Sequence, residues 1–314
     1  MERPEIKNDK LSQVVANIEK VIVGKREAIE LLLTAVLAGG HILIEDVPGV
    51  GKTQLVACVS HSLNGKFNRL QLTPDVMPSD ITGFSMINPL TKETEFRQGA
   101  AFCNFLLADE INRSSPKTQS ALLEIMEEGQ LSVDGITYKL PRPFMVLATQ
   151  NPVETYGTYH LPEAQMDRFL MKISMGYPEK SDELRILRRD ADAVPSNLDA
   201  VISTDEVETL KKEVLLVTCS PRIEEYIVNI AEASRNSEYI RLGISPRGSL
   251  ALHKCARAYA LLCGRNFVLP DDVKYLAPFV LSHRIILSPK GKSVMGTCEK
   301  ALQEIINTID VPIA

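Results

Sequence analysis

Residues 41–63 constrain the fold of this chain more than any other segment. The apolar run His-Ile-Leu-Ile-Glu at 41–45 is followed by Asp-Val-Pro-Gly-Val-Gly-Lys-Thr at 46–53 and then by residues 54–63, which suit a helix. A strand, a glycine-containing loop and a helix in direct succession are the setting of a phosphate-binding loop. Gly49 and Gly51 let successive backbone N–H groups point inward, and the helix N-terminus adds a favourable dipole. The segment therefore predicts a phosphate site at a strand end.

The side chains of this loop suit a nucleotide with its magnesium ion. Lys52 can reach the β- and γ-phosphates, and the Thr53 hydroxyl can ligate Mg²⁺. One residue departs from the usual pattern, because Asp46 stands where the first glycine is expected, and we expect its side chain to point outward. A glycine-rich turn with a surface lysine is the alternative for the loop taken alone. The expected nucleotide contacts in the loop are Pro48, Gly49, Val50, Gly51, Lys52, Thr53 and Gln54.

A pair of acids follows a second apolar strand. Residues 105–109 read Phe-Leu-Leu-Ala-Asp, and Glu110 comes next. Asp109 is the expected magnesium ligand, directly or through water, and Glu110 the expected general base that polarises the attacking water. An isolated Asp-Glu is often only an exposed acidic turn. About 55 residues beyond a Lys-Thr loop, the pair favours ATP hydrolysis.

The two halves of the chain differ in pattern. Up to about Pro178, short apolar runs alternate with helical stretches, which is typical of a parallel sheet; the candidate strands are 41–45, 67–72, 105–109, 144–149 and 170–175. The second half reads as helices only: Thr204 can cap one, Ser220 and Ser245 each precede a proline, and 271–281 and 292–309 are periodic. We predict an αβα P-loop NTPase core with a five-stranded parallel sheet at 1–178, then a linker and all-helical lid at 179–314.

Composition excludes several other classes. The net charge of −5, the 5% aromatic content and the absence of tryptophan disfavour nucleic acid as a partner. No apolar run reaches the roughly 18 residues of a membrane span. The six cysteines and five histidines are scattered without metal spacing, which predicts reduced thiols, no metal site beyond magnesium and a cytoplasmic location.

Two further segments have hairpin chemistry. Residues 130–140 carry Asp134-Gly135 between alternating segments, and both turn residues tolerate a positive φ. Residues 82–99 form a second insertion with turn residues at 88–89 and 92–93. Taken alone, each hairpin is ordinary surface decoration; the family resemblance described next implies instead that such projections face a partner or the axis of an assembly.

The combined motifs resemble the MoxR family of AAA+ ATPases over almost the whole chain. The resemblance rests on Glu45 to Thr53, Asp included, on Leu107-Ala-Asp-Glu-Ile-Asn-Arg113, on Ala148-Thr-Gln-Asn-Pro152, and on Leu161-Pro-Glu-Ala-Gln-Met-Asp-Arg-Phe169. It implies that Asn151 is sensor 1, that Arg168 is an arginine finger for the neighbouring subunit's ATP, and that Arg247 is sensor 2. It also implies that Val23 and Gly24 contact adenine. The plainer alternatives are a turn asparagine at 151, an ion pair of Arg168 with Asp167 or Glu163, and a solvated Arg247.

The resemblance further implies an assembly and a task. ATP and Mg²⁺ would lie between core and lid, and the active form would be a homo-hexameric ring. It would act as a chaperone-like motor that remodels a client or inserts metal into it, such as a separate protein with a von Willebrand factor A domain. The alternatives are a nucleotide-gated switch with little hydrolysis, or a magnesium-chelatase-like or nucleic-acid-remodelling motor.

Overall fold

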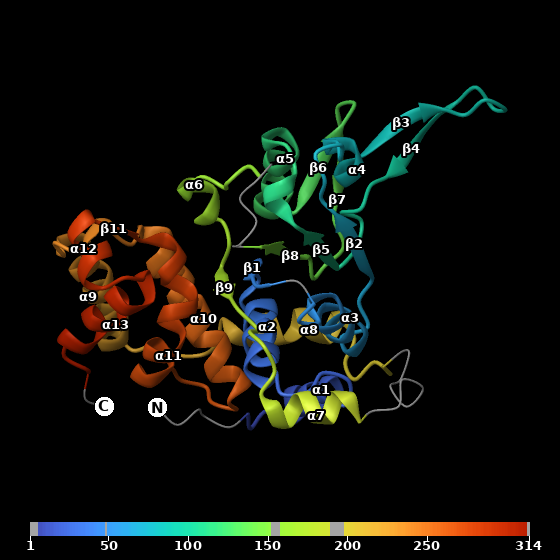
Figure 1. Ribbon diagram of the computed structural model, residues 1–314. Coiled ribbons are helices and arrows are strands. Elements are labelled where there is room, and N and C mark those ends of the chain that lie inside the picture. Colours follow the sequence, from blue (N-terminus) through green and yellow to red (C-terminus); the bar gives the residue numbers. More distant parts are fainter. Residues whose placement is uncertain (1–5, 48, 152–157, 189–197, 313–314) are drawn as a thin grey trace.

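A five-stranded parallel sheet forms the centre of the molecule (Figure 1). The computed structural model describes residues 6–47, 49–151, 158–188 and 198–312. The strands run in the order β2-β5-β8-β1-β9, all parallel to their neighbours. Their bounds are Phe67–Gln71 for β2, Phe105–Asp109 for β5, Met145–Gln150 for β8, Ile42–Glu45 for β1 and Met171–Ile173 for β9. The five predicted strands are confirmed.

Both faces of the sheet are buried, which explains the continuous apolar character of its strands. Neighbouring residues of a strand point to opposite faces. Ile42 and Ile44 accordingly join one hydrophobic cluster and Leu43 the other, and the strands β5 and β8 divide in the same way. Helices α1–α3 lie on one side of the sheet and α5 on the other (Figure 1). The predicted αβα layering is confirmed.

The helices of the core and of the following lid account for most of the remaining structure. We call α8–α13 the lid; its first helix packs on α2 of the core. Among the described helices, none is both long and apolar enough to cross a membrane. The bounds are Asp9–Glu19 (α1), Arg26–Ala38 (α2), Lys52–Ser62 (α3), Pro78–Thr82 (α4), Pro116–Glu128 (α5), Glu163–Met166 (α6), Lys180–Leu187 (α7), Thr204–Val214 (α8), Pro221–Asn236 (α9), Pro246–Leu262 (α10), Pro270–Leu281 (α11), Pro289–Val294 (α12) and Cys298–Thr308 (α13).

The lid differs from the sequence-based expectation in three details. The cap of α8 is Ser203 and not Thr204, because Ser203 and Glu206 satisfy each other's backbone N–H groups in a capping box. The single helix expected at 292–309 is two helices, since the chain turns at Gly296, whose φ is 76°. The lid also contains a small antiparallel ladder, β10 (Ile240–Leu242) with β11 (Ile286–Leu287), where only helices were expected. The caps at Ser220 and Ser245 are confirmed.

Both predicted hairpins are present. Strands β6 (Gln130–Val133) and β7 (Ile136–Lys139) are joined by Asp134 and Gly135, with φ of 51° and 78°. Strands β3 (Gly83–Ile87) and β4 (Thr94–Gln98) form a longer hairpin that projects away from the sheet (Figure 1). Leu90 at its tip is 93% exposed, so this hairpin presents an apolar residue to the surroundings.

His41 is a structural residue at the start of β1. Its Nδ1 accepts the Val146 N–H at 2.9 Å, so Nε2 carries the proton and donates to the Met126 carbonyl oxygen at 2.8 Å. The ring thereby ties β1 to β8 and α5. Burial lowers the pKa of His41 to about 4 from its usual 6.5.

This lowered pKa predicts acid sensitivity. Between pH 6.5 and about 4 the unfolded chain binds a proton at His41 that the folded chain does not, so stability falls as the pH is lowered. At pH 5, this linkage makes the free energy of unfolding about 2 kcal/mol smaller than at pH 7. We expect His41→Asn to lose stability at pH 7 but to show a smaller further loss between pH 7 and pH 5 than wild type. Urea unfolding at both pH values measures this, with the exposed His61→Asn as control; an unchanged pH dependence in His41→Asn would contradict it.

Candidate functional site

The loop after β1 adopts the expected cradle at the carboxyl edge of the sheet. Gly49 and Gly51 have φ of 86° and 85°, a conformation that side-chain-bearing residues rarely adopt. Gly51 is the N-cap of α3, so the free N–H groups of that helix face the loop. Lys52 donates to the carbonyl oxygens of Asp46 and Val47, at 3.1 and 3.4 Å. Pro48 lies outside the described residues.

A cavity of about 440 Å³ brings this loop together with the acid pair. The loop follows β1, the acids follow β5 and Asn151 follows β8, and parallel strands end at the same edge of a sheet. Asn151 is 7% exposed and lines the same space. The lining residues are Gly49, Gly51, Lys52, Thr53, Gln54, Arg69, Gln71, Asp109, Glu110, Thr149 and Asn151. The residues expected to hold magnesium and activate water therefore share one cavity.

Glu110 reaches this cavity through an unusual backbone conformation. Its φ is 60°, in the left-handed region, which costs a residue with a side chain about 1–3 kcal/mol. Consecutive side chains of a regular strand point to opposite faces, whereas this turn lets Asp109 and Glu110 line the same space. The backbone N–H of Glu110 donates to Thr149 Oγ1 at 2.9 Å. The local strain thus serves the placement of both carboxylates.

Neighbouring polar side chains orient the two acids. Asp109 accepts from Thr149 Oγ1 at 2.5 Å and from Arg69 Nη2 at 2.7 Å. The Glu110 carboxylate accepts from Gln71 Nε2 at 2.8 Å and pairs with Arg113 at 3.2 Å. Arg69, Gln71 and Thr149 were not predicted from the sequence. A signal was present for Arg69 and Gln71, because they are two residues apart and so lie on the same face of the strand that pairs with β5.

A second cavity, of about 390 Å³, adjoins the loop on its other side. It is more apolar and includes the segment expected to contact adenine, with Val23 among its lining residues. Gly24 is not among them: it has a φ of 69°, and a side chain there would collide with Asp182. The lining residues are Val21, Ile22, Val23, Lys25, Gly49, Val50, Gly51, Gln54, Met175, Pro178 and Ile186.

Asp46 fixes one wall of this second cavity. The expectation that its side chain points outward is wrong, since Asp46 is 5% exposed. Its carboxylate accepts from Ser174 Oγ at 2.8 Å, from the Met175 N–H and from the Gly176 N–H at 3.1 Å. From the other side, Lys25 Nζ donates to the carbonyl oxygens of residues 175–177, at 2.7 to 3.0 Å. The residue that replaces the usual glycine therefore holds the segment that lines the apolar cavity.

Asp46→Asn is expected to weaken ATP binding about tenfold or more, because a neutral amide replaces a carboxylate that accepts three hydrogen bonds, and bonds to charged groups contribute about 1.5–3 kcal/mol each. Isothermal titration calorimetry measures the affinity. Glu45→Gln is the matched control: its carboxylate pairs with Lys172 at 3.0 Å but lines neither cavity. A lower melting temperature with unchanged ATP affinity would show that Asp46 only stabilises the fold.

Arg168 and Arg247 do not line either cavity. Arg168 pairs with Glu127 of α5 at 3.3 Å, and not with Asp167 or Glu163. Arg247, in the first turn of α10, pairs with the other oxygen of the same carboxylate. Among the described residues, none beyond Ile186 lines either cavity. Arg247 is in the first turn of α10, as expected, but it does not line either cavity, and its role as sensor 2 stays a prediction.

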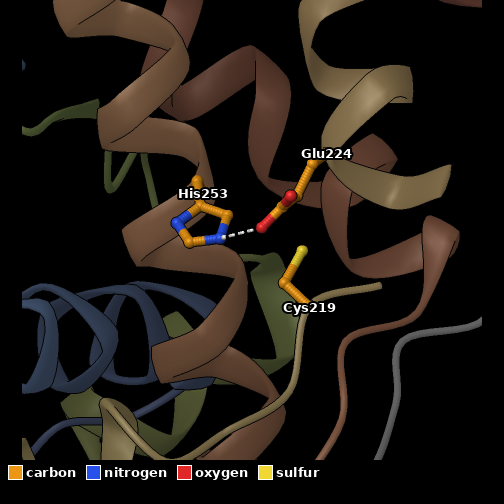
Figure 2. A group of neighbouring side chains, drawn as sticks. All are labelled: Cys219, Glu224 and His253. Atoms are coloured by element: carbon orange, nitrogen blue, oxygen red, sulfur yellow. Dashed lines mark ion pairs between the residues drawn. The ribbon is translucent and has the colours of Figure 1, made fainter. Parts of the chain in front are cut away.

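A cluster of potential metal ligands occurs in the lid, where the scattered sequence positions had predicted none. Ligand atoms of Cys219, Glu224 and His253 lie within 4.8 Å of one another (Figure 2). His253 Nε2 pairs with Glu224 at 3.6 Å across α9 and α10. Burial raises the pKa of the Cys219 thiol to about 11, the Glu224 carboxylate raises it further, and the Arg257 charge lowers it. A metal bound here would have to displace the proton of this thiol. All six cysteines are free, as predicted.

Four features together define an AAA-type ATPase. They are a phosphate-binding loop after a strand of a parallel sheet, an acid pair after a second strand, a polar residue after the adjacent strand, and a helical lid. Residues 41–171 match the model of the ATPase family associated with various cellular activities (AAA), and residues 232–306 match the AAA lid domain.

Similar proteins narrow the class further. The chain is 51% identical over 304 residues to protein YeaC of Bacillus subtilis (strain 168), covering 96% of this chain and 95% of that protein. It is 37% identical over 311 residues to chaperone MoxR1 of Mycobacterium tuberculosis, with 96% and 82% covered. A crystal structure from Cytophaga hutchinsonii superposes with a TM-score of 0.90 at 39% identity, over 97% and 96% of the two chains. The chain belongs to the MoxR family of AAA+ ATPases.

Proposed function

We propose that the 440 Å³ cavity binds the phosphates of ATP with Mg²⁺, and that Glu110 activates the water that attacks the γ-phosphate. The assignment rests on one observation. The same cavity is lined by Lys52, Thr53, Asp109 and Glu110. Thr53 and Asp109 would hold Mg²⁺, which would neutralise charge on the phosphates. Lys52 binds the β- and γ-phosphate oxygens, and the Asn151 amide positions the water. The apolar cavity beside the loop takes the adenine, with Val23 as one contact.

The geometry suits hydrolysis better than a switch that only binds nucleotide. A switch needs the cradle and a magnesium ligand but no base. Here Glu110 is held in a strained conformation beside Asp109, oriented by Gln71 and Arg113. Turning a carboxylate into the catalytic cavity at a conformational cost makes physical sense when that carboxylate takes part in the reaction.

We further propose that Arg168 acts on the ATP of a neighbouring subunit in a homo-hexameric ring. The position of Arg168 supports this role, because its side chain is 30% exposed and lines neither cavity of its own chain. A guanidinium supplied from outside stabilises the charge that spreads over the transferred phosphoryl group. Arg247 shares Glu127 with Arg168, so we assign it to the same inter-subunit site and not to the nucleotide of its own subunit.

ATP turnover drives a chaperone-like remodelling of a partner protein, such as one with a von Willebrand factor A domain. The relative MoxR1 is named a chaperone. The projecting β3–β4 hairpin offers a client surface, with Phe84, Ile87 and Leu90 at 49%, 65% and 93% exposure. We keep the division into a core at 1–178 and a linker with lid at 179–314 as part of this proposal.

A phosphate-release assay tests the assignment of the cavity. Wild type is expected to release phosphate from ATP with Mg²⁺, to lose this activity when EDTA removes the metal, and to regain it when Mg²⁺ is restored. Thr53→Ala is expected to need a higher Mg²⁺ concentration, because it lacks one ligand oxygen. Tight ATP binding without phosphate release by wild type would favour the nucleotide-gated switch instead.

A further inference from the structure

Arg284 of the lid makes an almost fully buried bridge to the residues on either side of Arg168. It ends the 3₁₀ turn Ser282–Arg284, and its side chain is 2% exposed. Nη1 donates to the Asp167 carbonyl oxygen at 2.8 Å, and Nη2 donates to the Phe169 carbonyl oxygen at 2.6 Å. The same guanidinium pairs with the Asp167 carboxylate. One planar group therefore holds the backbone immediately before and immediately after Arg168.

Two more lid residues reinforce this bridge. Ser245 accepts the Gly248 N–H as the cap of α10, and its hydroxyl donates to Asp167 Oδ2 at 3.2 Å. His283 contacts the Phe169 carbonyl oxygen through Nε2 at 3.1 Å. Burial lowers the pKa of His283 to about 3, so the ring is neutral and Nε2–H is the donor. Residues 167 and 169 thus receive polar contacts from two separate elements of the lid.

The core itself holds this segment only partly. Arg168 follows the short helix α6, whose last turn supplies a backbone bond from the Arg168 N–H to Gln165 at 3.2 Å. Phe169 anchors the other side, with its ring completely buried against the sheet. The Arg168 side chain remains accessible and reaches Glu127. The position of its backbone is therefore set jointly by the sheet and by the lid.

We propose that Arg284 is a positioning residue for Arg168, and that the lid sets through it how the arginine is presented to the neighbouring subunit. This inference rests on the proposed trans role of Arg168. A lysine could keep the charge but not the two-sided contact, because an ammonium is a point charge and a guanidinium a planar fork. Movement of the lid must either carry residues 167–169 with it or break buried, charge-assisted hydrogen bonds. The orientation of each lid is thereby coupled to the ATP site of the next subunit.

Arg284→Lys tests this positioning role. We expect kcat to fall about 10- to 100-fold, as a displacement of about 1 Å does at a catalytic group, with the affinity for ATP unchanged. Arg265→Lys is the matched control, because Arg265 makes a comparable two-pronged pair with the buried Asp272 elsewhere in the lid, at 2.6 and 2.9 Å. Both variants are expected to lose stability. Only in Arg284→Lys should kcat fall by more than the loss of folded protein explains.

Mixed assemblies distinguish a displaced finger from a damaged nucleotide site. Arg284→Lys mixed with Lys52→Ala is expected to regain activity, because the Lys52→Ala subunit supplies an intact Arg168 to the intact nucleotide site of its neighbour. Arg284→Lys mixed with Arg168→Ala is expected to regain none, since both lack a positioned finger. The reverse pattern would overturn the inference. Failure of Arg168→Ala with Lys52→Ala to complement would instead overturn the trans role on which it rests.

Ser245→Gly provides a second variant if Arg284→Lys does not fold. Glycine is a tolerable N-cap, so α10 is preserved while the hydroxyl contact to Asp167 is lost. A smaller fall in kcat is expected, about two- to fivefold, with the same complementation pattern. An unchanged kcat in Ser245→Gly, with Arg284→Lys unfolded, would count against the positioning role of the lid.

Discussion

Glu110→Gln is expected to bind ATP with Mg²⁺ as tightly as wild type and to hydrolyse it at least about 100-fold more slowly. Glutamine has nearly the same shape, and its amide oxygen can still accept from Gln71 at the position that is 2.8 Å away in the structure. It cannot accept a proton from the attacking water, so only the catalytic step is lost. Steady-state phosphate release measures the rate, and filter binding of labelled ATP measures the affinity.

Glu124→Gln is the matched control for this substitution. Glu124 is exposed on α5 and lines neither cavity, so its variant should hydrolyse ATP at the wild-type rate. Equal phosphate release by Glu110→Gln and wild type would show that Glu110 is not the base. Loss of ATP binding in Glu110→Gln would show that the carboxylate has a binding role instead.

The same variant gives access to the partner. An assembly arrested with ATP is expected to retain a client that wild type releases as it turns over, and Leu90→Ser should weaken that retention if the projecting hairpin contacts the client. Equal retention with ATP and with ADP would separate client binding from the nucleotide cycle.

The central sheet and its loop could be predicted because their signals are local. Residues 41–63 carry strand, loop and helix in sequence, and Asp134-Gly135 specifies its hairpin through two residues that tolerate positive φ. The acid pair is equally local, at the end of an apolar strand. Each of these features depends on residues that are close together in the sequence. It can therefore be predicted without knowledge of the tertiary structure.

The missed features depend on contacts between distant segments. Asp46 meets residues 174–176, about 130 positions later, because β1 and β9 are neighbours in the sheet. Arg69 and Gln71 reach the acids through the pairing of β2 with β5. The ladder of β10 and β11 was also invisible, since strands of three and two residues carry no periodic signal.

The surroundings of Arg247 could not be predicted either, because they depend on how the lid packs on the core. Its place in the first turn of α10 was predictable from Ser245-Pro246, and the cap is present as expected. Which surface that turn faces depends on how the lid packs on the core. The shared carboxylate of Glu127 places Arg247 beside Arg168, a relation that no local pattern could have specified.

A mixture of Arg168→Ala and Lys52→Ala is expected to recover ATPase activity that neither variant has alone. The first keeps an intact nucleotide site but supplies no arginine, and the second supplies the arginine but binds no productive ATP. In an equimolar random ring with head-to-tail contacts, about one quarter of the subunit junctions combine the two intact halves. The recovered rate per subunit should therefore approach one quarter of the wild-type rate if the sites work independently.

Lys52→Ala mixed with Glu110→Gln is the control for this recovery. Both substitutions damage the nucleotide site of the subunit that carries them, so no junction contains an intact site and activity should stay absent. Native mass spectrometry must show that the rings are mixed, because segregated rings would give the same negative result. With mixing established, absence of recovery for Arg168→Ala with Lys52→Ala would mean that Arg168 serves its own subunit or none. The pair with Glu127 would then be a structural link between core and lid and not the resting position of a finger.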